Sequence, residues 1–220
     1  MHAHVHVGVS SDLVRQADAV VRANAPQLNA AQRQMALAIG ALETGFGVSG
    51  TWLFDDGTPS YNWGGLVGSG TAGSLTHGDI NPDGTPTSMG FQAFNNMDEA
   101  FRSFLRTWSK PGNQEAAITG DALATARSMC ANGYFGGTRG TAEDRAQLYA
   151  KGILSTAKVI ASQLGEPLAV NWDSTRSGAL IGDRCNSTVT RTGSKKTPFI
   201  VATVLAAGFG FVAYWLAGKR

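Results

Sequence analysis

The feature that most constrains this chain is a helical pattern over residues 29–47 that ends in a carboxylate. Asn29 is a suitable N-cap because its side-chain oxygen can accept a hydrogen bond from a first-turn amide, and Gln32 completes a capping-box pattern three residues later. Gly45 and Gly47 allow the left-handed conformation that ends many helices. Apolar residues recur at helical spacing on one face, at Met35, Ile39 and Leu42. These signals predict one helix with Glu43 in its last turn.

Glu43 occupies an unfavourable position for helix stability. A carboxylate in the last turn faces the negative end of the helix dipole, at a cost of about 0.3–1 kcal/mol. The adjacent apolar face also removes hydration, and both effects raise the pKa of the carboxyl group. A general acid that works near neutral pH needs such a raised pKa, so Glu43 is a candidate for that role. The alternative from helix geometry alone is a solvated glutamate at a helix end.

Composition argues against several kinds of site. The 220 residues carry a net charge of +2, only 15% of them are charged, and no basic stripe stands out, so we expect no nucleic-acid partner. Cys130 and Cys185 are too few for a disulfide framework, and their spacing is no zinc motif. Asp79 and Asp83 match the start of a calcium loop, but the twelfth position is Gly90 rather than a bidentate glutamate. We therefore expect neither a metal nor another cofactor.

Helical periodicity disappears between residues 48 and 90, where small polar residues and glycine dominate. A loop this long inside a domain is usually functional. Aromatic residues are interspersed in it: Trp52, Phe54, Tyr61 and Trp63. Such residues either stack on sugar rings or hold the loop against the domain. Helical patterns return at 97–108, at 121–130 and after Thr141, so we expect a mainly α domain with a long Gly-rich loop or a small β region.

The C-terminal part has a different composition. Residues 199–218 contain no charge, and twenty helical residues span about 30 Å, the thickness of the hydrocarbon layer of a bilayer. Tyr214 and Trp215 are suitable interfacial aromatics. We expect a domain over residues 1–165, a polar linker over 166–197 and a transmembrane helix over 198–218. The alternative for the last segment is a buried core helix. The N-terminus lacks the pattern of a secretory signal peptide.

Four short motifs occur in a recognisable order. They are E-T-G-F-G from Glu43, Y-N-W-G-G-L from Tyr61, F-Q-A-F from Phe91 and N-G-Y ending at Tyr134, before a helix with Y-A at Tyr149. This order resembles the bacterial glucosaminidase family of the lysozyme-like superfamily, which includes flagellar rod hydrolases and phage wall-degrading enzymes. The resemblance covers roughly residues 11–160 and implies a lysozyme-like fold.

The resemblance also implies roles for particular residues. Glu43 matches the catalytic general acid, and Tyr134 matches a tyrosine that faces this acid across the groove. Further matches would contact the substrate: Tyr61, Asn62, Trp63, Gly64, Phe91 and Tyr149. The chain departs from the family after Tyr134, where F-G-G-T replaces A-T-D-P. The loop expected to hold a second carboxylate contains only aspartates: Asp55, Asp56, Asp79 and Asp83.

We therefore expect a peptidoglycan-degrading glycosidase with a glutamate general acid. A lytic transglycosylase on the same glycan strands is one alternative, since it can work with a single acid. A non-catalytic, membrane-anchored structural or sugar-binding protein is another. A C-terminal anchor without a signal peptide favours a phage virion membrane, where other virion proteins would be partners; the bacterial inner membrane is the alternative location.

Overall fold

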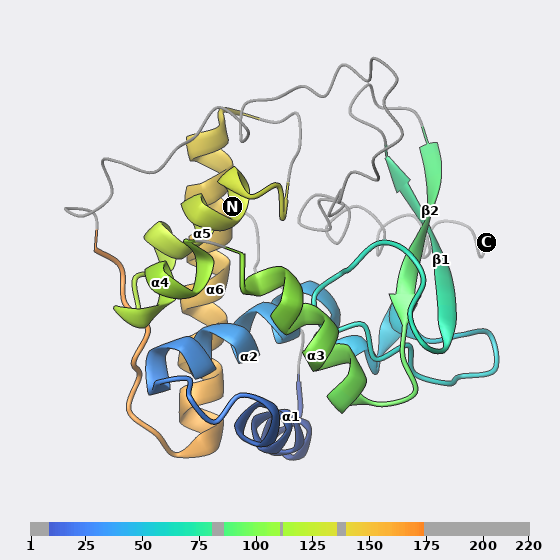
Figure 1. Cartoon of the computed structure of the whole chain (residues 1–220), viewed down its shortest axis with the longest axis horizontal. Coiled ribbons are helices and arrows are strands. Elements are labelled where there is room, and N and C mark those ends of the chain that lie inside the picture. The colour runs from blue at the N-terminus through green and yellow to red at the C-terminus, as the bar shows by residue number, and fades with distance from the viewer. Residues whose placement is uncertain (1–8, 81–85, 111, 136–139, 174–220) are drawn as a thin grey trace, which may run out of the picture.

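The computed structural model describes residues 9–80, 86–110, 112–135 and 140–173 (Figure 1). Its helices and strands follow one another as α1 (Ser11–Asn24), α2 (Ala30–Thr44), the 3₁₀ turns η1 (Gly45–Gly47) and η2 (Gly50–Trp52), β1 (Gly73–Ile80), β2 (Pro86–Ala93), α3 (Met97–Trp108), α4 (Asn113–Ile118), α5 (Ala122–Ala131) and α6 (Ala142–Leu164). The expected mainly helical domain is confirmed. Helix α4 was not predicted, because its six residues are too few for a periodic pattern.

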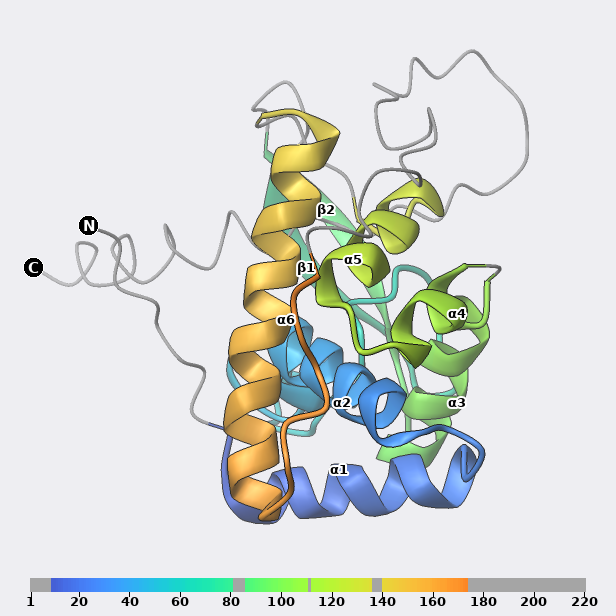
Figure 2. The same cartoon turned by 90° about the vertical axis from the view of Figure 1, so that its left-hand side faces the viewer.

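Helix α2 lies in the middle of the domain, in contact with α1, α4 and α6 (Figures 1 and 2). The predicted capping box is present: the amide of Gln32 donates to the side chain of Asn29 at 2.8 Å, and the amide of Asn29 donates back at 3.0 Å. The sequence predicted one buried face. In the structure every residue from Ala31 to Ala41 is buried, because neighbouring elements cover the polar faces of α2 as well.

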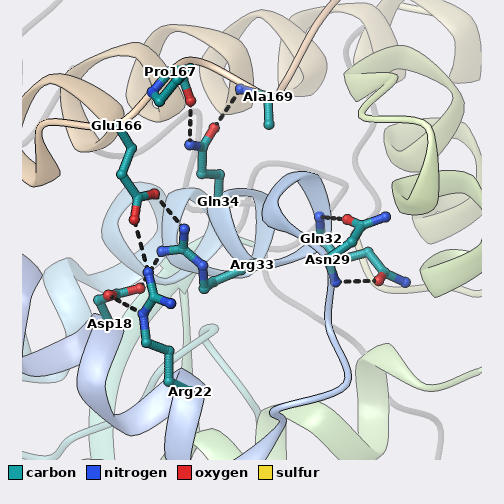
Figure 3. A network of polar contacts seen from close by, with 9 residues as sticks. All are labelled: Asp18, Arg22, Asn29, Gln32, Arg33, Gln34, Glu166, Pro167 and Ala169. Carbon is teal, nitrogen blue, oxygen red and sulfur yellow. Dashed lines mark hydrogen bonds and ion pairs between the residues drawn. The ribbon is translucent and has the colours of Figure 1, made fainter.

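Polar partners make the complete burial of α2 possible. The side chain of Arg33 is 8% exposed, and its guanidinium group pairs with Asp18 of α1 and with Glu166, which follows α6 (Figure 3). The amide side chain of Gln34 donates to the carbonyl of Pro167 and accepts from the amide of Ala169, both at 2.8 Å. Buried polar groups without such partners would destabilise the fold. These contacts join three separate parts of the chain.

The segment after α6 packs against the domain, although the polar linker was expected to begin at residue 166. Besides the contacts of Glu166 and Pro167 with α2, the amide of Asn171 donates to the carbonyl of Gly120 at 2.7 Å, and Val170 is buried. Residues 166–172 therefore belong to the packed domain. The rest of the expected linker and the expected membrane segment 198–218 lie outside the described residues. Within the described part of the chain, none of the helices is long and apolar enough to cross a bilayer.

The part of the chain without helical periodicity contains an antiparallel hairpin. Strands β1 and β2 pair from Gly73 opposite Ala93 to Ile80 opposite Pro86, which confirms the small β region. A separate apolar cluster packs at the hairpin, formed by Trp52, Leu75 and Phe91. The C-terminal end of α2 points toward this hairpin, away from α4 (Figure 1). This end of α2 carries the candidate acid.

Candidate active site

Glu43 is placed by an unusual end of α2. Gly45 caps the helix in the left-handed conformation, with φ of 57°, and its amide donates to Ala41 and Gly40. Phe46 and Gly47 follow with φ of 61° and 70°. Positive φ at a bulky residue such as Phe46 is strained, and strain of this kind concentrates at functional sites. The chain thus turns sharply away directly after Glu43.

The carboxyl group of Glu43 is shielded from solvent. The residue is 6% exposed, and burial raises the pKa of its carboxyl from the ordinary value of 4.5 to about 7, against an opposing polar interaction with the hydroxyl of Tyr149. Desolvation disfavours the charged form, so Glu43 holds its proton close to neutral pH. Its burial and raised pKa distinguish Glu43 from a solvated glutamate at a helix end.

The segment 61–66, here called the 61–66 turn, lies directly over Glu43. A methyl group built on Gly65 would lie 3.5 Å from Oε2 of Glu43, so only a residue without a side chain leaves this face of the carboxyl group unobstructed. The turn also crosses the end of α2 closely: a methyl group on Gly47 would lie 2.2 Å from the amide nitrogen of Asn62. Gly65 was not among the site residues expected from the sequence, although the adjacent glycines Gly64 and Gly65 after Trp63 indicate a close approach of the backbone to another group.

Asn62 and Trp63 hold this turn and do not line a groove in this structure. The side chain of Asn62 closes the turn by donating to the carbonyl of Leu66 at 2.9 Å and accepting from its amide at 2.8 Å. Trp63 is fully buried, and its indole nitrogen donates to the carbonyl of Ala36 at 3.1 Å. Its ring packs against Phe46 with centroids 4.8 Å apart. The sequence-based assignment of Asn62 and Trp63 as substrate contacts therefore does not fit their burial.

Two buried tyrosines approach Glu43 from other elements. Tyr134, 2% exposed, donates from its hydroxyl to the carbonyl of Gly64 at 2.8 Å, and its nearness to Glu43 adds to burial in raising the pKa of its phenol. Tyr149 of α6 is fully buried, and its ring packs on Phe135 with centroids 4.4 Å apart. The structure thus brings Glu43, Gly64, Tyr134 and Tyr149 together.

The other expected site residues lie farther from this group. Tyr61 is partly exposed beside the end of α2, with φ of 53°, and its amide donates to the carbonyl of Gly47 at 3.0 Å. Phe91 is buried in the hairpin cluster, 5.3 Å from Trp52 between ring centroids. Among the expected second carboxylates, Asp55 and Asp56 are exposed on the loop before the hairpin.

The remaining sequence-based expectations concern aspartates and metals. The side chain of Asp79 and the whole of Asp83 lie outside the described residues, and so does the expected calcium loop. Within the described part of the chain, no group of three or more His, Cys, Asp or Glu side chains could hold a metal ion.

Comparison with known proteins gives similarity at the level of structure only. No protein-family model and no curated protein matches the sequence. The peptidoglycan hydrolase of Sphingomonas sp. A1 superposes with a TM-score of 0.50 at 22% identity, over 71% of this chain and 94% of that chain. The glycoside hydrolase domain of Salmonella typhimurium FlgJ gives 0.45 at 18% identity, over 71% and 91%. The catalytic domain of the autolysin Auto from Listeria monocytogenes gives 0.43 at 14% identity, over 75% and 87%. At 22% identity the likeness to the Sphingomonas enzyme shows the fold alone: the chain has the fold of this peptidoglycan hydrolase.

Proposed function

We propose that this protein is a peptidoglycan-cleaving glycosidase in which Glu43 is the general acid. The observation that carries the proposal is a carboxyl group at the end of α2 that is 6% exposed and has a pKa of about 7. Cleavage of a glycosidic bond needs a proton on the leaving oxygen as the bond to the anomeric carbon breaks. A glutamate that is still protonated near neutral pH can supply it. The fold shared with a peptidoglycan hydrolase supports the choice of substrate.

The second half of the reaction decides between two enzyme classes. In a hydrolase, water attacks the oxocarbenium-like anomeric carbon and leaves a reducing sugar. In a lytic transglycosylase, the 6-hydroxyl of the same muramyl residue attacks and leaves a 1,6-anhydro ring. Among the described residues, burial and Tyr149 account for the pKa of Glu43, with no contribution from another carboxylate. This observation keeps the transglycosylase as the second candidate.

Glu43→Gln tests the proposal, because an amide of nearly the same shape cannot donate the required proton. We expect the variant to fold and to leave purified sacculi intact, while the matched change Glu115→Gln, at an exposed cap of α4, retains activity. Clearing of sacculi by Glu43→Gln would refute the assignment. Mass spectrometry of the wild-type products, reducing ends against 1,6-anhydromuramyl ends, separates the two enzyme classes.

The proposal extends to the location of the protein. The uncharged segment 199–218 supports a membrane anchor, and we propose that it holds the enzyme in a phage virion membrane beside other virion proteins, with the bacterial inner membrane as the alternative. Flotation of the full chain with lipid vesicles tests the anchor. A chain that stays in the dense fraction would contradict it. A protein that floats but cleaves no peptidoglycan would instead be a non-catalytic structural or sugar-binding protein.

A further inference from the structure

Tyr149 carries a buried hydroxyl group without an ordinary partner. The side chain is fully buried, and among the described residues no group forms a hydrogen bond of standard geometry with its hydroxyl. A buried donor that is left unpaired destabilises a protein. Phenylalanine would fill the same space without that penalty, so the hydroxyl is better explained by a role that a hydrophobic ring cannot perform.

The packing of α6 on α2 brings this hydroxyl to Glu43. Gly152 lies one turn after Tyr149 on the same face of α6, and a methyl group built on it would lie 3.0 Å from Cδ2 of Leu42. Leu42 directly precedes Glu43 in α2. The absence of a side chain at position 152 therefore allows α6 to approach α2 closely at the level of Glu43. The packing of Tyr149 on Phe135 also fixes its ring.

We propose that Tyr149 is a positioning residue for Glu43: its hydroxyl lies ready to donate a hydrogen bond to the carboxylate and sets the pH range over which Glu43 gives up its proton. The inference rests on the proposed function for its catalytic meaning. When Glu43 protonates the leaving oxygen, the carboxyl group becomes a buried anion. A donor hydrogen bond from Tyr149 to this anion stabilises it in a place that water does not reach.

Electrostatics agree with this geometry. Burial raises the pKa of Glu43, and the interaction with Tyr149 lowers it. Among the described residues, the titratable groups that face Glu43 are Tyr149 from α6 and Tyr134 from the segment after α5. The pKa of both phenols is raised well above the ordinary value, so both are neutral hydroxyl groups at the pH where Glu43 titrates. Tyr134 donates to Gly64 instead, which leaves Tyr149 as the donor for Glu43.

The test is a titration of Glu43 in the full chain, held in detergent micelles and labelled with ¹³C at the glutamate carboxyl carbon. The Glu43 signal is the one that disappears in Glu43→Gln. In Tyr149→Phe we expect its titration midpoint to move to higher pH by about half a unit or more, because the ionised form loses a donor. The alkaline limb of kcat/KM on peptidoglycan should move with it. Tyr134→Phe is the matched control: its hydroxyl donates to Gly64 rather than to Glu43, so its loss should not move the midpoint to higher pH.

An unchanged or lowered midpoint in folded Tyr149→Phe would overturn the inference. If Tyr149→Phe does not fold, the wild type still decides. A slowly exchanging hydroxyl proton of Tyr149 should appear above the midpoint, where Glu43 is ionised, and its absence there would also overturn the inference. If the midpoint moves as expected but the wild-type protein cleaves no peptidoglycan, the proposed function fails while the link between Tyr149 and Glu43 stands.

Discussion

The hydroxyl of Tyr134 donates a hydrogen bond of 2.8 Å to the carbonyl of Gly64, seventy residues earlier in the chain. The contact is tight, since a methyl group on Gly64 would lie 2.4 Å from this hydroxyl. Because Gly65 faces the carboxyl group of Glu43, the bond to Gly64 holds the 61–66 turn in place over the acid. Tyr134 therefore lies close to Glu43 and also holds the turn above it, a buried supporting role that its sequence motif did not predict.

Tyr134→Phe should weaken both the fold and the activity. The carbonyl of Gly64 would lose its donor in a buried place, and we expect the free energy of unfolding to fall by about 1–3 kcal/mol. Peptidoglycan cleavage should fall at every pH without a shift of the alkaline limb to higher pH, because the loss acts through the position of the turn. Urea unfolding and a pH series of the cleavage rate measure the two effects. A variant with wild-type stability would show that the hydrogen bond does not hold the turn.

Glu43 should make the protein less stable as the pH rises. Its pKa is about 7 in the folded state against 4.5 in the unfolded chain, so between these values the folded state binds more protons. The free energy of unfolding then decreases with rising pH, by about 3 kcal/mol over the window if the shift is fully expressed. Glu43→Gln has no such titration and should gain stability relative to the wild type between pH 4.5 and 7.

The measurement is the difference in unfolding free energy between the two proteins, taken by urea denaturation at pH 5, 6, 7 and 8. The pKa of His77 is lowered by burial, and its titration also contributes in this range. His77 is present in both proteins, so its contribution cancels in the difference. A difference that stays constant from pH 5 to pH 8 would mean that Glu43 titrates normally and is not the buried acid described above.

The sequence predicted the helix that carries Glu43 better than it predicted the surroundings of this residue. The capping box, the helix end at Gly45 and the unfavourable place of Glu43 are local features, and the structure reproduces them. The burial of Trp63 depends on Gly40 and on α3, which lie far from it in sequence, so the sequence could not decide whether this aromatic residue stacks on a sugar or holds its loop against the domain. The approach of Tyr149 to Glu43 likewise depends on how α6 packs, and no local pattern contains that information.

The contact between Gly40 and Trp63 is open to a direct test. A methyl group on Gly40 would lie 2.4 Å from the indole nitrogen of Trp63, so Gly40→Ala should destabilise the protein by about 1–3 kcal/mol, although alanine favours a helix over glycine. Trp63→Ala removes the ring that would clash and should make the effect of Gly40→Ala smaller. A double-mutant cycle on unfolding free energies measures the coupling, and additive effects would place the indole elsewhere.

Residues 166–172 should contribute to the stability of the domain through their polar contacts. Arg33 is 8% exposed and shares its guanidinium group between Asp18 and Glu166, so removal of Glu166 leaves a buried cation with one of its two partners. Gln34 would lose both of its contacts beyond residue 165, and Gly120 would lose the amide of Asn171. A chain that ends at residue 165 should therefore be less stable than one that ends at 173, by about 3–5 kcal/mol, the usual effect of breaking a buried ion pair.

In a chain ending at 173, Glu166→Gln isolates the contribution of the charge, and we expect it to lower the stability by less than the truncation does. Thermal and urea unfolding measure both effects. Equal stability of the chains ending at 165 and 173 would mean that residues 166–172 rest on the domain without supporting it, and that the domain ends where the sequence pattern placed its boundary.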